Sequence, residues 1–390
     1  MSLPLLPPGS NAERSRAYNR GLVLGHVRRA GASGRAEIAR ASGLSTQAVS
    51  NIIGELVAEG WLYEAGRRTG GRGLPAVTYA IDGAAGTAFG IELRPNAVLC
   101  ALIDLDGRAL YTDRVAVSRA DPGHVVQLVS QLLERALSNS RTKVARVLGA
   151  GVVMPGPFGK TGLSGFLTEL PGWEGLDAQA LFAEVLDMAV TVENDANAAA
   201  MAERVSGVAA GLSSYAFLYF GTGIGLGLVS GGTIFRGAFG NAGEIGHVPA
   251  PFEGGLKPLE EIASRMALTT ALRGAGEAAE TVTDLDRLFE QRHPAMMAWI
   301  EGARPALSHA VHIVENLYDP EAVIMGGALP ARLLQHLTDT TPLPSLSVSN
   351  RADRNCPRLL AGTAGRMTAT HGAAALVINQ TLTPSLGLAT

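Results

Sequence analysis

The sequence predicts an α/β protein with a small winged helix-turn-helix head followed by a larger, two-part body. Three observations support this fold class. Residues 34–62 fit two short helices joined by a tight turn, two β-like runs with an Arg-bearing loop follow, and strand-like and helical segments then alternate. We therefore expect a flexible tail at 1–11, the head at 12–82 and the body at 83–390.

The helix pair combines an apolar face with a polar one. Ile38, Ala41 and Leu44 make the first helix apolar on one side, and Gly43 suits the turn. Ser45 is a favourable N-cap for the second helix, whose apolar residues recur at helical spacing: Val49, Ile52, Ile53 and Leu56. The opposite side carries Thr46, Gln47, Ser50 and Asn51. Because short polar side chains there can hydrogen-bond base edges in a major groove, we expect these four to contact DNA.

The next segment predicts a wing. Two β-like runs, around Trp61–Glu64 and Ala76–Ile81, flank a loop that carries Arg67, Arg68 and Arg72 among glycines. A basic loop without acidic residues can follow phosphates or enter the minor groove. The alternative is an ordinary helical hairpin followed by a surface turn, with no role in DNA binding.

Charge and cysteine content restrict the function classes. Residues 1–82 contain ten Arg, no Lys and six acidic residues, a net charge of +4, whereas the whole chain carries −3. This suits a DNA-contacting head on a body that does not attract nucleic acid, although a solvated surface gives the same count. Cys100 and Cys356 alone make neither a disulfide framework nor a cysteine-rich zinc site. Without a signal peptide or a long apolar run, we expect a cytoplasmic protein with no membrane partner.

A strand-to-helix junction in the body carries a candidate catalytic group. A strand is predicted at Val190–Val192 and a helix at Asn197–Ser206, with Asn194 and Asp195 between them. Ligands commonly bind at the carboxyl ends of strands in α/β folds, and a carboxylate there can accept a proton from a substrate hydroxyl. The alternative is that Asn194 or Asp195 only caps the helix.

A glycine-rich segment follows. Gly221, Thr222 and Gly223 lie between two strand-like runs, where bare amides can approach phosphate oxygens. Glu244 and His247 are three residues apart and are flanked by glycines, so they can form a polar fork for vicinal hydroxyls. A buried core histidine is the alternative for His247.

Together these segments resemble the long form of the ROK family of repressors, open reading frames and sugar kinases. The resemblance extends from about Asn19 to Val377 and is carried by EIARASGLSTQAVSNIIGEL, ENDANAAAMAE, GTGIGLGLVSGGTIFRGAFGNAGEIGH and VIMGGAL, in the family's order. It implies an actin-like (ribonuclease H-like ATPase) body of two lobes, with a hinge near 195–206 and a sugar bound between the lobes.

The resemblance also implies roles for individual residues. Five are expected to bind the sugar: Asn194, Asp195, Glu244, His247 and Glu260. Asp195 also matches the general base of the kinase members. Trp173 matches an aromatic residue beside the pocket, and a core role for it is equally open.

Two departures from the family pattern argue against an enzyme. Kinase members have a glycine-containing phosphate loop where this chain has Glu92–Ala97, and Arg94 and Pro95 there add bulk and remove an amide donor. The family's zinc is held by a histidine matching His247 and three cysteines, none of which occurs between Val248 and Glu261. We therefore expect no zinc, no ATP as cofactor, and only a vestigial phosphate site at Gly221–Gly223.

The favoured function is a sugar-responsive repressor of carbohydrate genes. It would bind operator DNA as a homodimer or dimer of dimers, and a sugar effector would change the arrangement of the lobes. The first alternative is an ATP-dependent sugar kinase that uses Asp195 as its base. The second is a DNA-bound regulator whose pocket no longer binds sugar. Activation in place of repression is also open.

Overall fold

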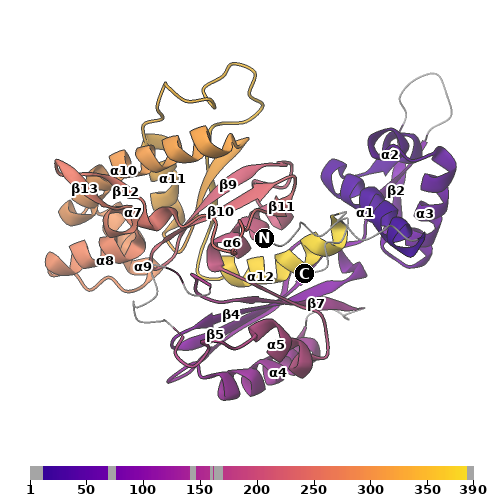
Figure 1. The fold of residues 1–390 in the computed structure, drawn as a ribbon, viewed down its shortest axis with the longest axis horizontal. Coiled ribbons are helices and arrows are strands. Elements are labelled where there is room, and N and C mark those ends of the chain that lie inside the picture. Colours follow the sequence, from indigo (N-terminus) through magenta and orange to yellow (C-terminus); the bar gives the residue numbers. More distant parts are fainter. Residues whose placement is uncertain (1–11, 69–75, 141–145, 159–160, 162–169, 384–390) are drawn as a thin grey trace, which may run out of the picture.

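The computed structural model describes residues 12–68, 76–140, 146–158, 161 and 170–383, and it shows a small head beside a two-lobed body (Figure 1). The head contains three helices and a three-stranded antiparallel sheet. The helices are α1 (Ala12–Ala30), α2 (Arg35–Ser42) and α3 (Thr46–Ala58), and the strand order is β1 (Ser33–Gly34), β3 (Ala76–Ile81), β2 (Leu62–Arg68). This is the expected winged helix-turn-helix.

Local interactions explain the helix pair. Gly43 ends α2 with a φ of 70°, a left-handed conformation that glycine adopts without steric cost, and the Ser45 hydroxyl accepts the Ala48 N–H at 3.2 Å. All four predicted apolar residues of α3 are buried. The prediction for Ala41 was wrong: it is exposed and Ala39 is buried instead, because α2 begins at Arg35 and turns Ile38 and Ala39 together toward α1 and α3. The sequence analysis did not foresee α1, which adds Val23, Leu24 and Val27 to this core.

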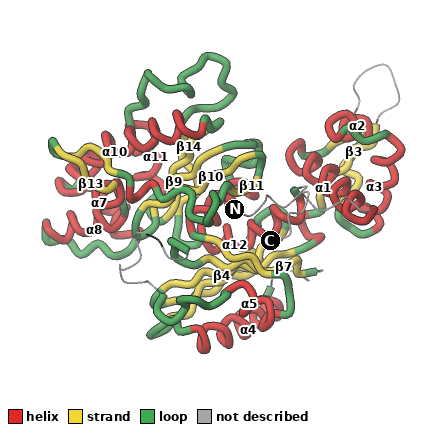
Figure 2. Tube along the Cα trace, in the orientation of Figure 1, coloured by secondary structure: helices red, strands yellow, loops and turns green. Residues whose placement is uncertain are grey.

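The first lobe of the body is a five-stranded mixed sheet. Its strand order is β6 (Ala109–Ala116), β5 (Ala97–Asp104), β4 (Thr87–Arg94), β7 (Val147–Val153), β8 (Val190–Glu193). The first three strands are antiparallel, and β7 and β8 join them in parallel. The helices α4 (Pro122–Asn139) and α5 (Ala178–Leu186) cover one face, and α12 (Thr368–Leu382) lies on the other (Figures 1 and 2).

The second lobe is built around another five-stranded sheet. The order is β11 (Thr233–Ile234), β10 (Ile224–Ser230), β9 (Tyr215–Phe220), β14 (Ala322–Gly327), β15 (Leu359–Ala364), with β9, β14 and β15 parallel. A hairpin of β12 (Pro249–Phe252) and β13 (Gly255–Pro258) leads into the helical part. Its helices are α7 (Leu259–Ala263), α8 (Arg265–Gly274), α9 (Val282–Glu290), α10 (Pro294–Tyr318) and α11 (Ala331–Thr340).

Two helices lie between the sheets and join the lobes. The helix α6 (Asp195–Ser206) packs on β9 and β10, α12 packs on β4 and β7, and the two helices pack against each other (Figure 1). Glycine is required at two points of this packing, one between α12 and α6 and one between β7 and α12. A Cβ at Gly372 would overlap the backbone of Ala198, and one at Gly151 would overlap the backbone of Ala373. The lobes are therefore connected through a tightly packed helix pair.

Some element boundaries differ from the prediction. The strand β2 continues to Arg68 because it stays paired with β3 beyond a bulge at Gly66, so Arg67 and Arg68 lie on a strand and not in a loop. The helix α6 begins at Asp195 and not at Asn197, because Asn194 acts as its cap. Within the described residues, no helix is long and apolar enough to cross a membrane.

Candidate functional site

The polar face of α3 points away from the head's core. Thr46, Gln47 and Asn51 are exposed and Ser50 is half-buried. The Gln47 side chain donates a hydrogen bond from Nε2 to Oδ1 of Asn51 at 2.9 Å. This bond holds the two amides side by side, with polar groups remaining for base edges. The arrangement is the one expected of a recognition helix.

The three predicted wing arginines have different surroundings. Arg67 is exposed on β2. Arg68 is tied back to the head, because its Nη1 lies 2.9 Å from Glu37 Oε1 and its Nη2 donates to the carbonyl of Ala32. The hydrogen bond from the Gly34 N–H holds the pKa of Glu37 below its ordinary value, and the positive charge of Arg68 also lowers this pKa. Arg72 lies outside the described residues, so Arg67 is the described wing arginine best placed for a phosphate.

Asn194 and Asp195 lie at the start of α6. Oδ1 of Asn194 accepts the Asn197 N–H at 2.8 Å, so the capping role that the sequence left open is present for Asn194. Asp195 Oδ1 accepts the Ala196 N–H at 2.9 Å, and its other oxygen faces Gly221 in the turn between β9 and β10. Asp195 is therefore at the boundary between α6 and the second lobe.

Glu244, His247 and Glu260 form one polar group. His247 Nε2 is 3.7 Å from Glu244 Oε2, and Nδ1 is 3.4 Å from Glu260 Oε1. The His247 side chain is 40% exposed, which excludes the alternative of a buried core histidine. Burial raises the pKa of Glu244; the nearby His247 opposes this rise and Glu260 adds to it. The group can accept and donate hydrogen bonds to adjacent hydroxyls.

Glycines bring the five predicted sugar residues together. A side chain at Gly156 would lie 3.8 Å from Glu244 Oε1 and 3.9 Å from Asn194 Cβ, so both residues border the same point. A Cβ at Gly223 would overlap the carboxylate of Glu260, which therefore lies directly on the hairpin turn. With Asp195 against Gly221 on the same turn, and His247 next to Glu244 and Glu260, the five residues form one connected group.

The β12–β13 hairpin positions Glu260. Its strands pair from Pro249 with Pro258 to Phe252 with Gly255, and the Leu259 N–H donates to the carbonyl of Val248 at 3.0 Å. This hairpin occupies the segment where the family has its zinc cysteines, and the residues present do not fit such a site. Within the described residues, no group of three His, Cys, Asp or Glu side chains is arranged to hold a metal ion.

The Glu92–Ala97 segment has no glycine cradle. Arg94 Nε lies 2.6 Å from Glu92 Oε1, while Nη2 donates to the carbonyl of Arg366 at 2.8 Å. Buried Glu92 also accepts the Thr370 hydroxyl at 2.6 Å. Burial alone would lower the pKa of Arg94. The nearby Glu92, Tyr219 and Asp195 together raise this pKa by a larger amount, so the net shift is upward. An arginine side chain paired with Glu92 thus occupies the segment where the family has its phosphate loop.

Two contacts across the lobes were not predicted from the sequence. The Asn241 side chain accepts the Phe158 N–H at 2.7 Å and donates to the Phe158 carbonyl at 2.9 Å. Arg236 Nε lies 2.9 Å from the buried Glu193 carboxylate. Burial raises the pKa of Glu193, and Arg236 opposes the rise. The segment between β11 and Glu244 therefore connects the second lobe to the ends of β7 and β8. The only sequence signal for this connection is that Asn241 lies three residues before Glu244.

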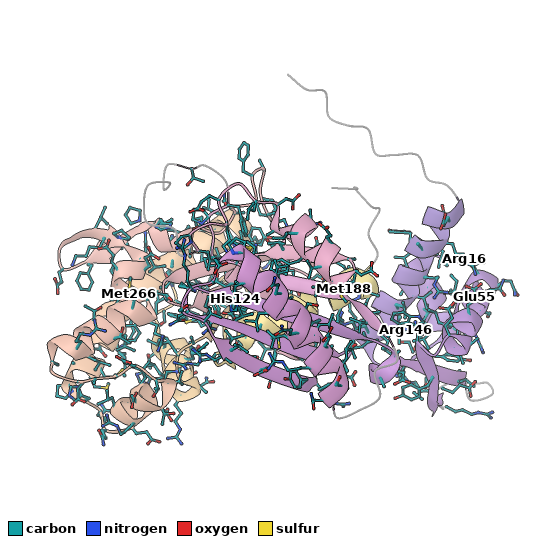
Figure 3. The ribbon with its side chains drawn as sticks, turned by 90° about the horizontal axis from the view of Figure 1, so that it is seen from below. Arg16, Glu55, His124, Arg146, Met188 and Met266 are labelled. Carbon is teal, nitrogen blue, oxygen red and sulfur yellow. The ribbon has the colours of Figure 1, made fainter. Side chains whose placement is uncertain are left out.

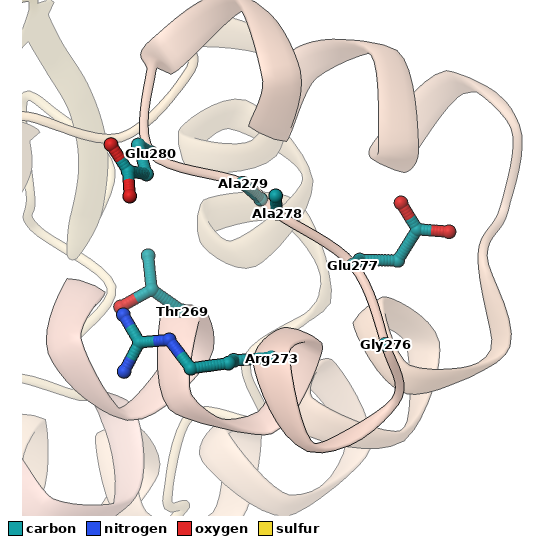
Figure 4. A pocket seen from close by; sticks show the side chains of 7 residues that line it. All are labelled: Thr269, Arg273, Gly276, Glu277, Ala278, Ala279 and Glu280. Carbon is teal, nitrogen blue, oxygen red and sulfur yellow. The ribbon is translucent and has the colours of Figure 1, made fainter.

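Trp173 and a surface pocket lie outside this group. Trp173 is buried in the first lobe, where Nε1 donates to the Ala120 carbonyl at 2.7 Å and the ring stacks on Phe182, so it has the core role. The segment from Phe166 to Glu169 lies outside the described residues. A pocket of about 210 Å³ lies between α8 and residues 276–280, with Thr269 and Arg273 on its wall (Figure 4). It includes none of the predicted sugar residues.

The head contacts the body through the packing of α1 against α12 and through Arg146, just before β7 (Figure 3). Its guanidinium lies 4.7 Å from the centre of the Trp61 ring, and Nη2 donates to the Glu59 carbonyl at 2.9 Å. The far end of β7 leads to Gly156, beside Asn194 and Glu244. A single strand thus connects the contact with the head to the candidate sugar site.

Comparison with known proteins decides the family. Residues 88–380 match the ROK family. The chain belongs to the ROK family. Residues 18–73 match the MarR family, in agreement with the winged helix-turn-helix fold of the head.

Among ROK relatives, both regulators and kinases occur. The chain is 25% identical over 314 residues to the xylose repressor of Caldicellulosiruptor bescii, covering 75% of this chain and 78% of that protein. It is 24% identical to the xylose repressor of Bacillus subtilis, covering 80% of this chain and 82% of the repressor. A glucokinase of Halalkalibacterium halodurans is 24% identical and matches 62% of this chain and 79% of the kinase.

Solved structures agree on the fold. A ROK family transcriptional regulator, described as a homologue of the E. coli MLC protein, superposes with a TM-score of 0.69 and 21% identity, covering 95% of this chain and 97% of that one. A ROK hexokinase from Thermus thermophilus gives a TM-score of 0.55 with 26% identity, covering 75% of this chain and 97% of its own. The first match includes the head as well as both lobes.

Proposed function

We propose that this ROK protein is a sugar-responsive transcriptional repressor. The observation that carries the proposal is the joint presence of a helix with an exposed polar face in the head and a group of polar residues that match the family's sugar contacts, with Arg94 in place of a glycine-rich phosphate loop. The similarity to xylose repressors over three quarters or more of the chain supports it. A protein that keeps a sugar site and lacks the phosphate cradle can bind an effector without consuming it.

The proposed mechanism joins the two ends of β7. A sugar bound by Asn194, Glu244 and His247 would alter the contacts of the adjacent segment 154–158 with Asn241. Because β7 continues from there to Arg146, such a change would reach the contact with Trp61. The sugar must bind one arrangement of lobes and head better than the other, since only differential affinity changes DNA binding.

The test is fluorescence anisotropy of the purified protein on DNA from upstream of its own gene and neighbouring genes. Salt-sensitive, sequence-selective binding that one sugar of a broad panel relieves is the expected result. Binding that strengthens with sugar would indicate an activator. Specific binding that no sugar changes would favour a regulator whose pocket does not bind sugar, and absence of specific binding would contradict the proposal.

Two variants separate base readout from phosphate contact. Asn51→Ala is expected to weaken specific binding by about 5- to 150-fold, equivalent to about 1–3 kcal/mol, and to leave non-specific binding nearly unchanged. Arg67→Gln is expected to weaken binding to all sequences alike and to reduce the salt dependence by about one phosphate contact. Both side chains are exposed, so neither change should affect folding.

The second candidate function is an ATP-dependent sugar kinase, because Asp195 lies where the family has its general base and kinases are among the relatives. An ADP-release assay across hexoses and amino sugars, with Asp195→Asn as the control, tests it. We expect no sugar-dependent ADP release from either protein. Turnover by the wild type that is lost in Asp195→Asn would replace the repressor proposal.

We further propose that the protein is a homodimer or dimer of dimers, since two heads would bind a two-fold symmetric operator. Light scattering after size-exclusion chromatography measures this, and a monomer at micromolar concentration would contradict it. We also propose that the protein binds no zinc. Tightly held stoichiometric zinc in a metal analysis would overturn that proposal.

A further inference from the structure

The last turn of α1 brings an arginine of the head to the body. The helix α1 packs on α12, which in turn packs along α6 (Figure 1). Arg28, in the last turn of α1, is half-buried, and its Nη2 is fully covered and has no hydrogen-bond partner among the described residues. A charged donor of the head is therefore enclosed without an acceptor.

The nearest cation of the body is Arg204, in the last turn of α6. Its Nε donates to Oδ1 of Asn379 on α12 at 3.0 Å, and its Nη1 donates to the Leu212 carbonyl at 2.7 Å. A Cβ at Gly232, in the turn between β10 and β11, would overlap its Nη2. The guanidinium of Arg204 is thus fixed in position by three segments of the body.

The contact between the two arginines is unfavourable for Arg28. Burial, and then the charge of Arg204, lower the pKa of Arg28 to about 10, although Tyr215 and Asp106 act in the opposite direction. Burial also lowers the pKa of Arg204. A charged donor that loses water and gains no acceptor raises the free energy of the state that encloses it.

Carboxylates lie near this contact, but each has other partners. Asp106 pairs with Arg108 at 3.1 Å. Glu203 and Glu321 each accept two backbone N–H groups. Within the described residues, no carboxylate forms an ion pair with Arg28 or Arg204. The cost therefore comes from the enclosed, unpaired donor and its like-charged neighbour, and not from a net charge of the region.

The other end of α6 lies at the candidate sugar group. Asn194 caps the helix, and Asp195 is its first residue and faces Gly221. The twelve residues of α6 extend over about 18 Å, so one helix joins the sugar group to the arginine contact. Because a Cβ at Gly372 would overlap the Ala198 backbone, α6 and α12 are packed too closely to move independently.

We propose that the contact of Arg28 with Arg204 is a release point built into the attachment of the head, and that a sugar bound at the start of α6 promotes release through this helix. The second part rests on the proposed function, which places the sugar at Asn194 and Asp195. Release lets water hydrate the unpaired donor of Arg28, so it offsets part of the packing lost between α1 and α12. A small displacement of α6 then changes the population of the attached head.

Elastase cleavage of the whole chain at 83–86, between head and body, measures release. Arg28→Met removes the charge and keeps an apolar stem, and it should be cut at least about 5-fold more slowly than the wild type. Arg28→Lys keeps the charge and should be cut at least as fast as the wild type. Arg40→Met, at an exposed arginine of α2, is the matched control and should be cut at the wild-type rate.

Circular dichroism establishes that each variant is folded before digestion. Folded Arg28→Met protein that is cut as fast as the wild type, or faster, would overturn the release point. Slowing of the same size in Arg28→Lys would also overturn it, because that variant retains the charge.

The connection through α6 is tested with the sugar panel of the DNA assay. At least one sugar should accelerate cleavage of the wild type. By linkage, calorimetry should show that this sugar binds Arg28→Met more weakly, by up to the factor by which cleavage is slowed. Arg28 lies in the head and outside the sugar group, so a purely structural role would leave sugar affinity unchanged. Acceleration by no sugar, or equal affinity for both proteins, would refute the connection.

The two assays separate this inference from the proposed function. If Arg28→Met slows cleavage but the protein binds no DNA specifically, the release point stands and the repressor function is wrong. If one sugar relieves specific DNA binding and binds the wild type and Arg28→Met equally, the repressor function stands and the connection through α6 is wrong.

Discussion

Replacement of Arg146 by alanine should weaken the attachment of the head to the body, which then depends more on the packing of α1 against α12. The lost interactions are a cation–π contact at 4.7 Å and a charged hydrogen bond to the Glu59 carbonyl at 2.9 Å. At partly exposed sites these contribute about 0.5 and about 1.5 kcal/mol, the lower ends of their ranges. Together they amount to about 2 kcal/mol, which corresponds to about a 30-fold increase in the population with a released head.

Limited elastase digestion of the connector measures this population. The connector includes the short 3₁₀ helix Gly83–Ala85, which is held between head and body: the Asp82 N–H donates to the Trp61 carbonyl and the Leu105 N–H donates to the Gly83 carbonyl. When the head reattaches faster than the protease cuts, the cleavage rate is proportional to the released population. Cleavage at 83–86, followed by mass spectrometry, should therefore accelerate about 30-fold in Arg146→Ala.

Arg114→Ala is the matched control, because Arg114 is an exposed arginine on β6. It should be cut at the wild-type rate, and Arg146→Lys, which keeps only a point charge, should give an intermediate rate. If folded Arg146→Ala protein is cleaved less than about 3-fold faster than the wild type, the contact does not hold the head, because that ratio is equivalent to only about 0.7 kcal/mol.

Three further predictions concern stability. Ser45→Ala should lower the unfolding free energy of the head by about 1 kcal/mol in urea denaturation, through loss of the α3 cap, whereas an unchanged midpoint would mean that the cap contributes nothing. Burial raises the pKa of Glu244 in the folded state, so ionisation of this carboxyl group disfavours folding. Glu244→Gln should therefore have a higher melting temperature than the wild type at neutral pH, and the difference should disappear as the pH falls below the ordinary carboxyl pKa. A constant difference in melting temperature at all pH values would refute this prediction. Gly372→Ala, whose new Cβ would overlap the Ala198 backbone, should lower the unfolding free energy by about 1–3 kcal/mol or more, and a wild-type melting temperature would contradict the close helix contact.

The structure of the head could be predicted from its sequence because interactions between neighbouring residues determine it. The helical spacing of Val49, Ile53 and Leu56, the cap at Ser45 and the turn at Gly43 are each decided by neighbouring residues, and the structure has all of them. The polar face of α3 then follows from the same periodicity. Ala41 was misjudged because one alanine in an eight-residue helix does not reveal which side the rest of the head will cover.

The candidate sugar residues could be selected from the sequence because they stand in short motifs, and the resemblance implied their roles. Their proximity in the folded protein could not be derived from their separations in the sequence. Glu260 reaches Gly223 through the β12–β13 hairpin, and Asn194 approaches Glu244 only across Gly156. These are contacts between residues far apart in the chain, which depend on how two sheets and a helix pair assemble.

The sequence by itself determined the fold class, the recognition helix and the loss of the glycine phosphate loop, since each depends on residue types within a few positions of one another. Only the assembled structure shows that Arg68 is paired with Glu37, that Arg146 contacts Trp61, and that Arg94 donates to the carbonyl of Arg366. The physical reason is that charge acts through space, so the surroundings of an arginine are unknown until distant segments have been brought together.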